Sequence, residues 1–176
     1  MSLNYDQNQN FTVDFAVDIN RYMGRWFEIA RLPSWFEQDC DNVSADYSVA
    51  VASSNIADVR VRVRNQCTYR GQTKSVEGVA RVTDPPTCSK LQISFSSFLP
   101  WSLSGGSYWI LDLDKDNYSW AMVGNPQKNA LWMLSRTPLM DQPVFSLLYN
   151  RALVKGFEVS KLIMTDQKEN VSLQLF

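Results

Sequence analysis

The sequence predicts an all-β fold: an eight-stranded, antiparallel, up-and-down β-barrel with one α-helix packed outside it and a short final strand. Three observations predict it. Short segments of alternating apolar and polar residues recur from Val43 onward, turn-forming residues separate them, and the apolar period changes once, near the end, to helical spacing. A chain of 176 residues is by default one compact domain.

Eight segments have the alternation of a strand. The clearest is 59–65, where three valines alternate with three arginines, so that one face is apolar and the other is charged. The expected strands are 26–31, 43–49, 59–65, 76–82, 91–95, 108–113, 118–123 and 131–136.

Turn residues connect these segments as sequential hairpins. Gly71 stands between the third and fourth strands, Asp84-Pro85-Pro86 follow the fourth, and Gly124-Asn125-Pro126 precede the last. Such a sheet removes its exposed edges by closing on itself, and eight strands leave an interior that holds one small ligand.

The helix is expected between Asp141, a candidate N-cap, and Gly156, a stop, with Pro143 in its first turn. Its apolar residues at helical spacing are Val144, Leu147, Leu148 and Ala152. A final strand is expected in 157–164. We expect an N-terminal extension at 1–19, the barrel with its helix and final strand at 20–165, and a tail at 166–176.

Composition excludes several classes of function. Seventeen Lys and Arg nearly balance eighteen Asp and Glu, which argues against nucleic-acid binding. The absence of histidine removes the usual general base, zinc ligand and catalytic triad. Three widely spaced cysteines form no Cys-x-x-Cys pair. We therefore expect no metal and no cofactor. No apolar run approaches the roughly 20 residues that span a bilayer.

Three motifs carry a resemblance to a known family. Gly24-Arg25-Trp26 stand at the head of the first strand, Asp114 and Tyr118 follow the sixth, and Arg136 ends the last. In order and spacing they resemble the lipocalins, and within them the bacterial lipocalins, apolipoprotein D and the temperature-induced plant lipocalins. The resemblance implies that Gly24, Trp26 and Arg136 build the closed end of the barrel, with the guanidinium stacked on the indole.

The strand period then sets the lining of the barrel. With Trp26 and Arg136 inward, Glu28, Ala30, Trp132 and Leu134 also face inward, and the resemblance places Ala45 and Tyr47 inside. The other residues expected inside are Val61, Val63, Gly78, Ala80, Leu91, Ile93, Phe95, Tyr108 and Ile110. Asp112 is also expected inside, paired with Arg136 or a hydroxyl.

Candidate ligand contacts are chosen from this lining. Trp132, Tyr47 and Tyr108 are preferred, because a large amphipathic ring offers apolar area and one polar tip. The remaining candidates are Ala45, Val61, Ile93, Phe95, Ile110, Leu134 and, in the loop over the mouth, Phe36. Each lining residue could also simply fill an ordinary barrel core.

Two aromatic loops are expected at the open rim. Trp35 and Phe36 are candidate lid residues or pack beneath their own loop, while Phe98 and Trp101 lie at the same rim. These loops could contact a lipid surface or a second protomer, so a homodimer is one of the alternatives.

The connections alternate between the two barrel ends, which places Cys40 and Cys67 at the open end and Cys88 at the closed end. Only Cys40 and Cys67 are then close enough for a disulfide.

The function that the resemblance implies is non-catalytic binding, storage or transport of a fatty acid or lysophospholipid. It also implies an outer-membrane lipoprotein facing the periplasm, whose leader and acylated cysteine do not stand in this chain. One alternative is a lipocalin-type isomerase or de-epoxidase with Glu28 or Asp112 as acid or base. Another is a heme-binding or protein-interaction module, which without histidine would need Tyr, Cys or Met ligation.

Overall fold

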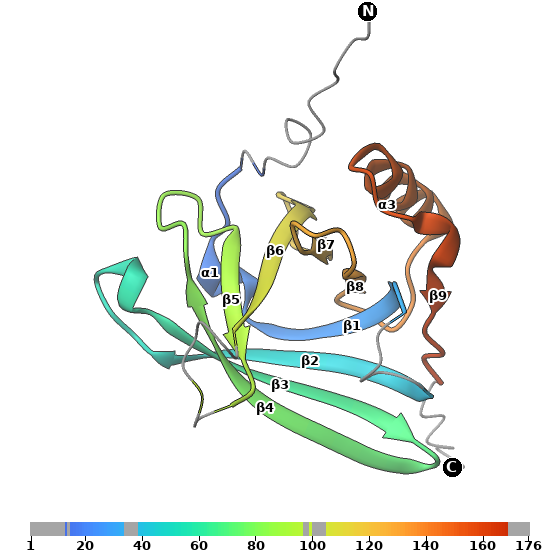
Figure 1. Cartoon of the computed structure of the whole chain (residues 1–176), viewed down its shortest axis with the longest axis horizontal. Coiled ribbons are helices and arrows are strands. Elements are labelled where there is room, and N and C mark those ends of the chain that lie inside the picture. Colours follow the sequence, from blue (N-terminus) through green and yellow to red (C-terminus); the bar gives the residue numbers. More distant parts are fainter. Residues whose placement is uncertain (1–12, 14, 34–38, 97–98, 100–104, 169–176) are drawn as a thin grey trace, which may run out of the picture.

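The computed structural model describes residues 13, 15–33, 39–96, 99 and 105–168. Within them the chain folds into a barrel of strands with one longer helix outside it (Figure 1). The strands are β1 (Gly24–Arg31), β2 (Cys40–Val51), β3 (Arg60–Tyr69), β4 (Gln72–Val82), β5 (Lys90–Ser94), β6 (Gly106–Leu113), β7 (Trp120–Gly124), β8 (Leu131–Ser135) and β9 (Ile163–Met164). The helices are α1 (Ile19–Tyr22) and α3 (Gln142–Val154), with 3-10 turns at Ile56–Asp58 and Val159–Lys161.

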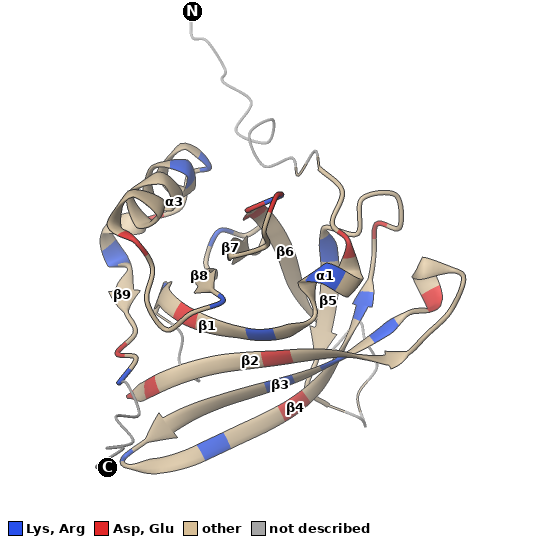
Figure 2. Ribbon diagram, turned by 180° about the vertical axis from the view of Figure 1, so that it is seen from behind, with Lys and Arg blue, Asp and Glu red and all other residues tan. Residues whose placement is uncertain are grey.

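The strand order confirms the predicted fold class. Each strand from β2 to β8 pairs antiparallel with the next, β8 pairs with β1, and β1 pairs with β2, so the eight strands close into a barrel. β9 adds to the free part of the edge of β1. Basic and acidic residues are interspersed along the described strands (Figure 2).

Alternation of side chains divides the apolar residues into two clusters. One lines the inside of the barrel and takes residues from all eight strands, among them Trp26, Val61 and Val63. The other lies between the barrel wall and α3, where Leu148 and Ala152 are fully buried. The helix thus packs its apolar face on the outer wall, as its spacing predicted, and Gly156 ends it with a φ of +85°.

The predicted strand in 157–164 is wrong for most of its length. Phe157 is buried after the helix, a 3-10 turn follows at Val159–Lys161, and only Ile163–Met164 pair with β1. The sequence analysis also missed α1, whose first backbone N–H groups are capped by the carboxylate of Asp18.

Two β-bulges reverse the predicted phase of the residues after them. In β1 the register shifts between Glu28 and Ala30, and in β6 it shifts between Ile110 and Asp112. The predictions that Ala30 and Asp112 face the interior are therefore wrong. Ala30 lies in the cluster beneath α3, and Asp112 forms an ion pair with Arg151 of α3 at 2.5 Å.

The segment before α1 packs on the barrel. Val13 is buried in the cluster near α3, Val17 and Ile19 are buried in the inner cluster, and the Val17 N–H donates to the carbonyl of Thr87 at 2.7 Å. Among the described residues no helix combines the length and the apolar character that crossing a membrane requires.

Candidate functional site

The inner wall brings together most of the predicted ligand contacts. Those that are buried in the inner cluster are Tyr47, Val61, Ile93, Tyr108, Ile110 and Leu134. Ala45 and Trp132 are partly buried against the same cluster. Phe36, with Trp35, Phe98 and Trp101, lies outside the described residues.

Phe95 is placed differently from the other candidates. It follows the end of β5, is 46% exposed, and lines a pocket of about 460 Å³ together with Arg62, Gly78 and Val79. Its ring covers Gly78, where an added Cβ would come within 2.7 Å of a ring carbon and 2.6 Å of the Ser94 carbonyl oxygen.

The closed end is held by the stack that the motifs predicted. The guanidinium carbon of Arg136 lies 3.8 Å from the centre of the fully buried Trp26 ring. The same guanidinium donates to the carbonyl oxygens of Arg21 at 2.8 Å, Arg25 at 2.9 Å and Tyr118 at 3.2 Å. Arg136 therefore ties α1 and β1 to the end of β8.

A chain of tyrosine hydroxyls crosses the interior above this stack. The hydroxyl of Tyr108 lies 2.8 Å from those of Tyr22 and Tyr47. Burial raises the pKa of Tyr22 and of Tyr108 well above the ordinary value of a tyrosine, and the neighbouring phenols raise the pKa of Tyr108 further. Sequence analysis missed Tyr22, because it lies in α1, outside every predicted strand.

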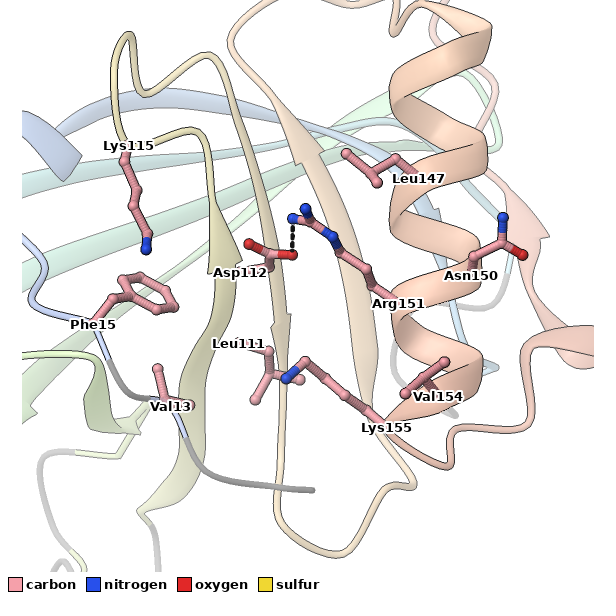
Figure 3. Close-up of a pocket in the computed structure, with 10 residues that line it drawn as sticks. All are labelled: Val13, Phe15, Leu111, Asp112, Lys115, Leu147, Asn150, Arg151, Val154 and Lys155. Atoms are coloured by element: carbon pink, nitrogen blue, oxygen red, sulfur yellow. Dashed lines mark hydrogen bonds and ion pairs between the residues drawn. The ribbon is translucent and has the colours of Figure 1, made fainter. Parts of the chain in front are cut away.

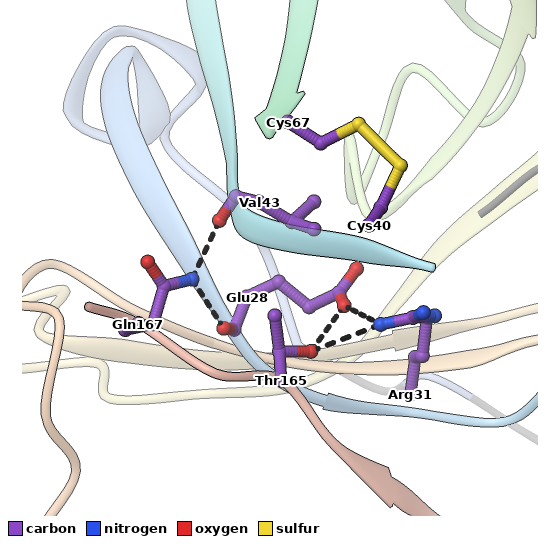
Figure 4. A network of polar contacts seen from close by, with 7 residues as sticks. All are labelled: Glu28, Arg31, Cys40, Val43, Cys67, Thr165 and Gln167. Carbon is purple, nitrogen blue, oxygen red and sulfur yellow. Dashed lines mark hydrogen bonds and ion pairs between the residues drawn. A yellow bond between two sulfur atoms is a disulfide. The ribbon is translucent and has the colours of Figure 1, made fainter. Parts of the chain in front are cut away.

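A buried ion pair lies on the inner wall toward the open end (Figure 4). Arg31 Nη1 donates to Glu28 Oε1 at 2.7 Å and contacts Thr165 Oγ1 at 3.1 Å, and the Thr165 hydroxyl donates to the same carboxylate oxygen. The Glu28 and Arg31 side chains are 4% and 6% exposed. Their register partners, Leu134 and Trp132, belong to the inner cluster. The strand phase predicted the inward position of Glu28 but missed Arg31, because the bulge lies between the two.

Residues 163–167 fill the seam between β1 and β2 at this end. The Thr165 N–H donates to the Ile29 carbonyl at 3.0 Å, and the Asn42 N–H donates to the Asp166 carbonyl at 2.7 Å. The side-chain amide of Gln167 donates at 2.8 Å to the carbonyl oxygens of both Glu28 and Val43 (Figure 4). This segment completes the wall where β1 and β2 no longer pair.

Cys40 and Cys67, the pair that the strand order permits, are joined by a disulfide at the same end, with 5.5 Å between their Cα atoms. Cys88 is a free thiol. Burial raises its pKa.

The part of the inner wall beyond β5 is accessible. Val76 pairs with Asn65 and shares the face of Gly78 and Ala80, yet it is 49% exposed. A side chain on this face would be buried in a solid core. Trp132, on the opposite side, is also only partly buried. Apolar groups of the inner wall are therefore open to solvent toward the mouth.

The two carboxylates that were alternatives for acid or base chemistry are both engaged. Glu28 accepts hydrogen bonds from Arg31 and Thr165, and Asp112 lies outside the barrel against Arg151. In the part of the chain that the structure describes, no three His, Cys, Asp or Glu side chains cluster as metal ligands would.

A further pocket of about 550 Å³ lies outside the barrel, between the segment before α1, β6 and α3 (Figure 3). It is separate from the inner wall, because the Leu111 and Asp112 side chains that line it point to the outer face of β6.

Comparison with known proteins agrees with this geometry. Residues 17–167 match the family described as a lipocalin-like domain. The outer membrane lipoprotein Blc of Vibrio cholerae is 34% identical over 86% of this chain and 83% of its own length. The temperature-induced lipocalin-1 of Arabidopsis thaliana is 34% identical over 88% of this chain and 81% of its own length.

Solved structures show the same fold. Insecticyanin from the tobacco hornworm Manduca sexta superimposes with a TM-score of 0.66 at 20% identity, covering 88% of this chain and 83% of that one. The closed barrel, the stacked Trp26 and Arg136 and the extent of the matches lead to one conclusion. The chain belongs to the lipocalin family, whose barrels bind small hydrophobic ligands.

Proposed function

We propose that this protein binds a single-chain lipid, a long-chain fatty acid or a lysophospholipid, inside the barrel and carries it unchanged. The observation that carries the proposal is an apolar inner wall that stays accessible toward the mouth, where Val76 is 49% exposed and Trp132 is only partly buried. An alkyl chain fits this wall, and a polar head group can stay in water at the open mouth.

The energetics of burial favour such a ligand. About fifteen methylenes at about 0.8 kcal/mol each give roughly 12 kcal/mol before losses. Lost translational and chain entropy removes much of this, which leaves micromolar to nanomolar affinity. Because one methylene changes the free energy of binding little, we expect weak selectivity among similar chain lengths.

The location proposed for this protein is the cell envelope, as an outer-membrane lipoprotein facing the periplasm. The support is its similarity to proteins named outer membrane lipoprotein Blc in Vibrio cholerae and Escherichia coli, the latter 35% identical over 89% of this chain. We propose no catalytic step.

Native mass spectrometry of delipidated protein tests the binding. We expect a 1:1 complex with oleate or with an oleoyl lysophospholipid, and the absence of both complexes would contradict the proposal. Ala45→Trp adds a large ring on the inner face of β2 and should abolish the complex. Ser48→Trp, on the exposed outer face of the same strand, is the matched control and should bind as the unmodified chain does. Circular dichroism checks that both variants fold.

A further inference from the structure

The external pocket is built like a ligand site, although it lies apart from the barrel interior. We propose that it binds a second small ligand: an anionic amphiphile with a carboxylate or phosphate head on a short alkyl body. Its volume of about 550 Å³ falls in the range of small-molecule pockets. The inference goes beyond the proposed function, because it needs no ligand in the barrel.

The floor and one wall of the pocket are apolar. Val13, Phe15 and Leu111 come from the segment before α1 and from β6, and Leu147 and Val154 come from α3 (Figure 3). Val154 is 71% exposed and Leu147 is also exposed. Leu147 and Val154 form one exposed face of α3 beside the buried Val13 and Leu111. Together they offer an apolar surface that an alkyl chain can cover.

Cations from three elements surround this floor. Lys115 stands on the loop after β6, Arg151 in α3 and Lys155 directly after α3, and all three line the pocket. Figure 3 shows the Lys155 side chain reaching toward Leu111, and the Lys115 ammonium above Phe15, 5.0 Å from the ring centre.

Among the described lining residues, one carboxylate faces these cations. Asp112 forms an ion pair with Arg151, with 2.5 Å between Asp112 Oδ2 and Arg151 Nη1. Lys115 and Lys155 form no ion pair with any described residue. Lys155 is nevertheless half-buried rather than extended into water. Lys115 is exposed, but its ammonium lines the same pocket, and two ammonium groups at one site concentrate positive potential, which an anionic head would neutralise.

The burial of Leu111 decides between possible occupants. A flat bilayer would contact the exposed Leu147 and Val154 but not Leu111, which is 3% exposed, whereas a molecule with a short chain can lie against Leu111 with its head between the two lysines. The shared chemistry of a carboxylate and a phosphate head is therefore tested with two free amphiphiles, decanoate and decyl phosphate. Decanol supplies the same chain without charge.

Amide chemical shifts in a titration of the full chain locate the binding. We expect decanoate or decyl phosphate to shift the amides of Leu111, Arg151 and Lys155. The double variant Lys115→Glu/Lys155→Glu should weaken this binding by about tenfold or more. Lys74→Glu is the matched control, because Lys74 also stacks on a ring, that of Tyr69 at 3.8 Å, but lies on β4. It should leave the affinity unchanged.

Several results would overturn the inference. These are an absence of shifts around the pocket at millimolar ligand, equal binding of decanol, or equal weakening by Lys74→Glu. Binding to anionic vesicles without binding of either amphiphile would assign the face to a lipid surface instead. Binding only after removal of residues 1–12 would mean that the chain itself occupies the pocket.

The failure of this proposal is distinguishable from failure of the barrel proposal. Shifts confined to inward residues such as Val61 and Val63 would refute the external site and support the barrel site.

Discussion

The buried pair of Glu28 and Arg31 yields the sharpest prediction. In Glu28→Met the guanidinium keeps its charge but loses the carboxylate 2.7 Å away, in a place where both side chains are almost fully buried. Removing one partner of such a buried pair costs about 3–5 kcal/mol, because the remaining charge loses its main ion pair in a place shielded from water. A domain of this size is stable by only about 5–15 kcal/mol in total. We therefore expect a large fall in the urea midpoint at pH 7.

The double variant Glu28→Met/Arg31→Met separates charge from packing. Both charges are removed and the volumes stay similar, so its free energy of unfolding should lie within about 1 kcal/mol of the original, or above it. The surface pair of Arg25 and Asp46 is the control. It has a similar distance of 2.8 Å but side chains 52% and 34% exposed, so that Asp46→Asn should cost no more than about 1 kcal/mol. If Glu28→Met costs no more than Asp46→Asn, or if the double variant is as unstable as the single one, the reasoning is refuted.

Three further changes test other parts of the fold. Gly78→Ala should lower the free energy of unfolding by about 1–3 kcal/mol, because the added Cβ would lie 2.6 Å from the Ser94 carbonyl oxygen. Gly106→Ala, whose Cβ would lie 3.9 Å from the Ile93 carbonyl oxygen, should be nearly neutral, and equal urea midpoints for the two variants would contradict this. Arg136→Ala should lower the free energy of unfolding, measured by thermal unfolding, by about 2–4 kcal/mol, because it removes the stack on Trp26 and three hydrogen bonds to carbonyl oxygens. A loss below about 1 kcal/mol would show that the stack does not hold the closed end. Because the pKa values of Tyr22 and Tyr108 are raised in the folded protein, the unfolded chain loses these protons first above the ordinary tyrosine pKa of about 10, so the free energy of unfolding should fall as the pH rises through this range. Ultraviolet titration should show a group of tyrosines that ionise only on unfolding, and complete ionisation of the folded protein at about pH 10 would disprove this.

The barrel was predictable where alternation runs unbroken. Val61 and Val63 in β3, and Trp132 and Leu134 in β8, face inward as the period of two requires. Where a bulge inserts one residue, the pattern gives no warning. In β6 the residues around the shift are apolar on both faces, since one face packs on the inner cluster and the other on α3. The phase of Asp112 was lost there.

The candidate site was predictable in its apolar part and less so in its polar part. Tyr47 and Tyr108 stand on predicted strands, so their convergence followed from phase. Tyr22 joins them from a short helix that has no period to detect. Thr165 reaches Glu28 across 137 positions of sequence, and no local pattern predicts a contact at that distance.

The seam between β1 and β2 sets an order in which the protein can be completed during synthesis. A ribosome delivers β1 early, but the residues that close the slit beside it, 163–167, emerge more than 130 positions later. Until then the seam between β1 and β2 of the nascent barrel stays open, and water reaches the Glu28 carboxylate. The wall of this barrel is therefore completed only after its last strand is translated. A polypeptide that ends before residue 163 would keep a gap in the barrel wall near the mouth.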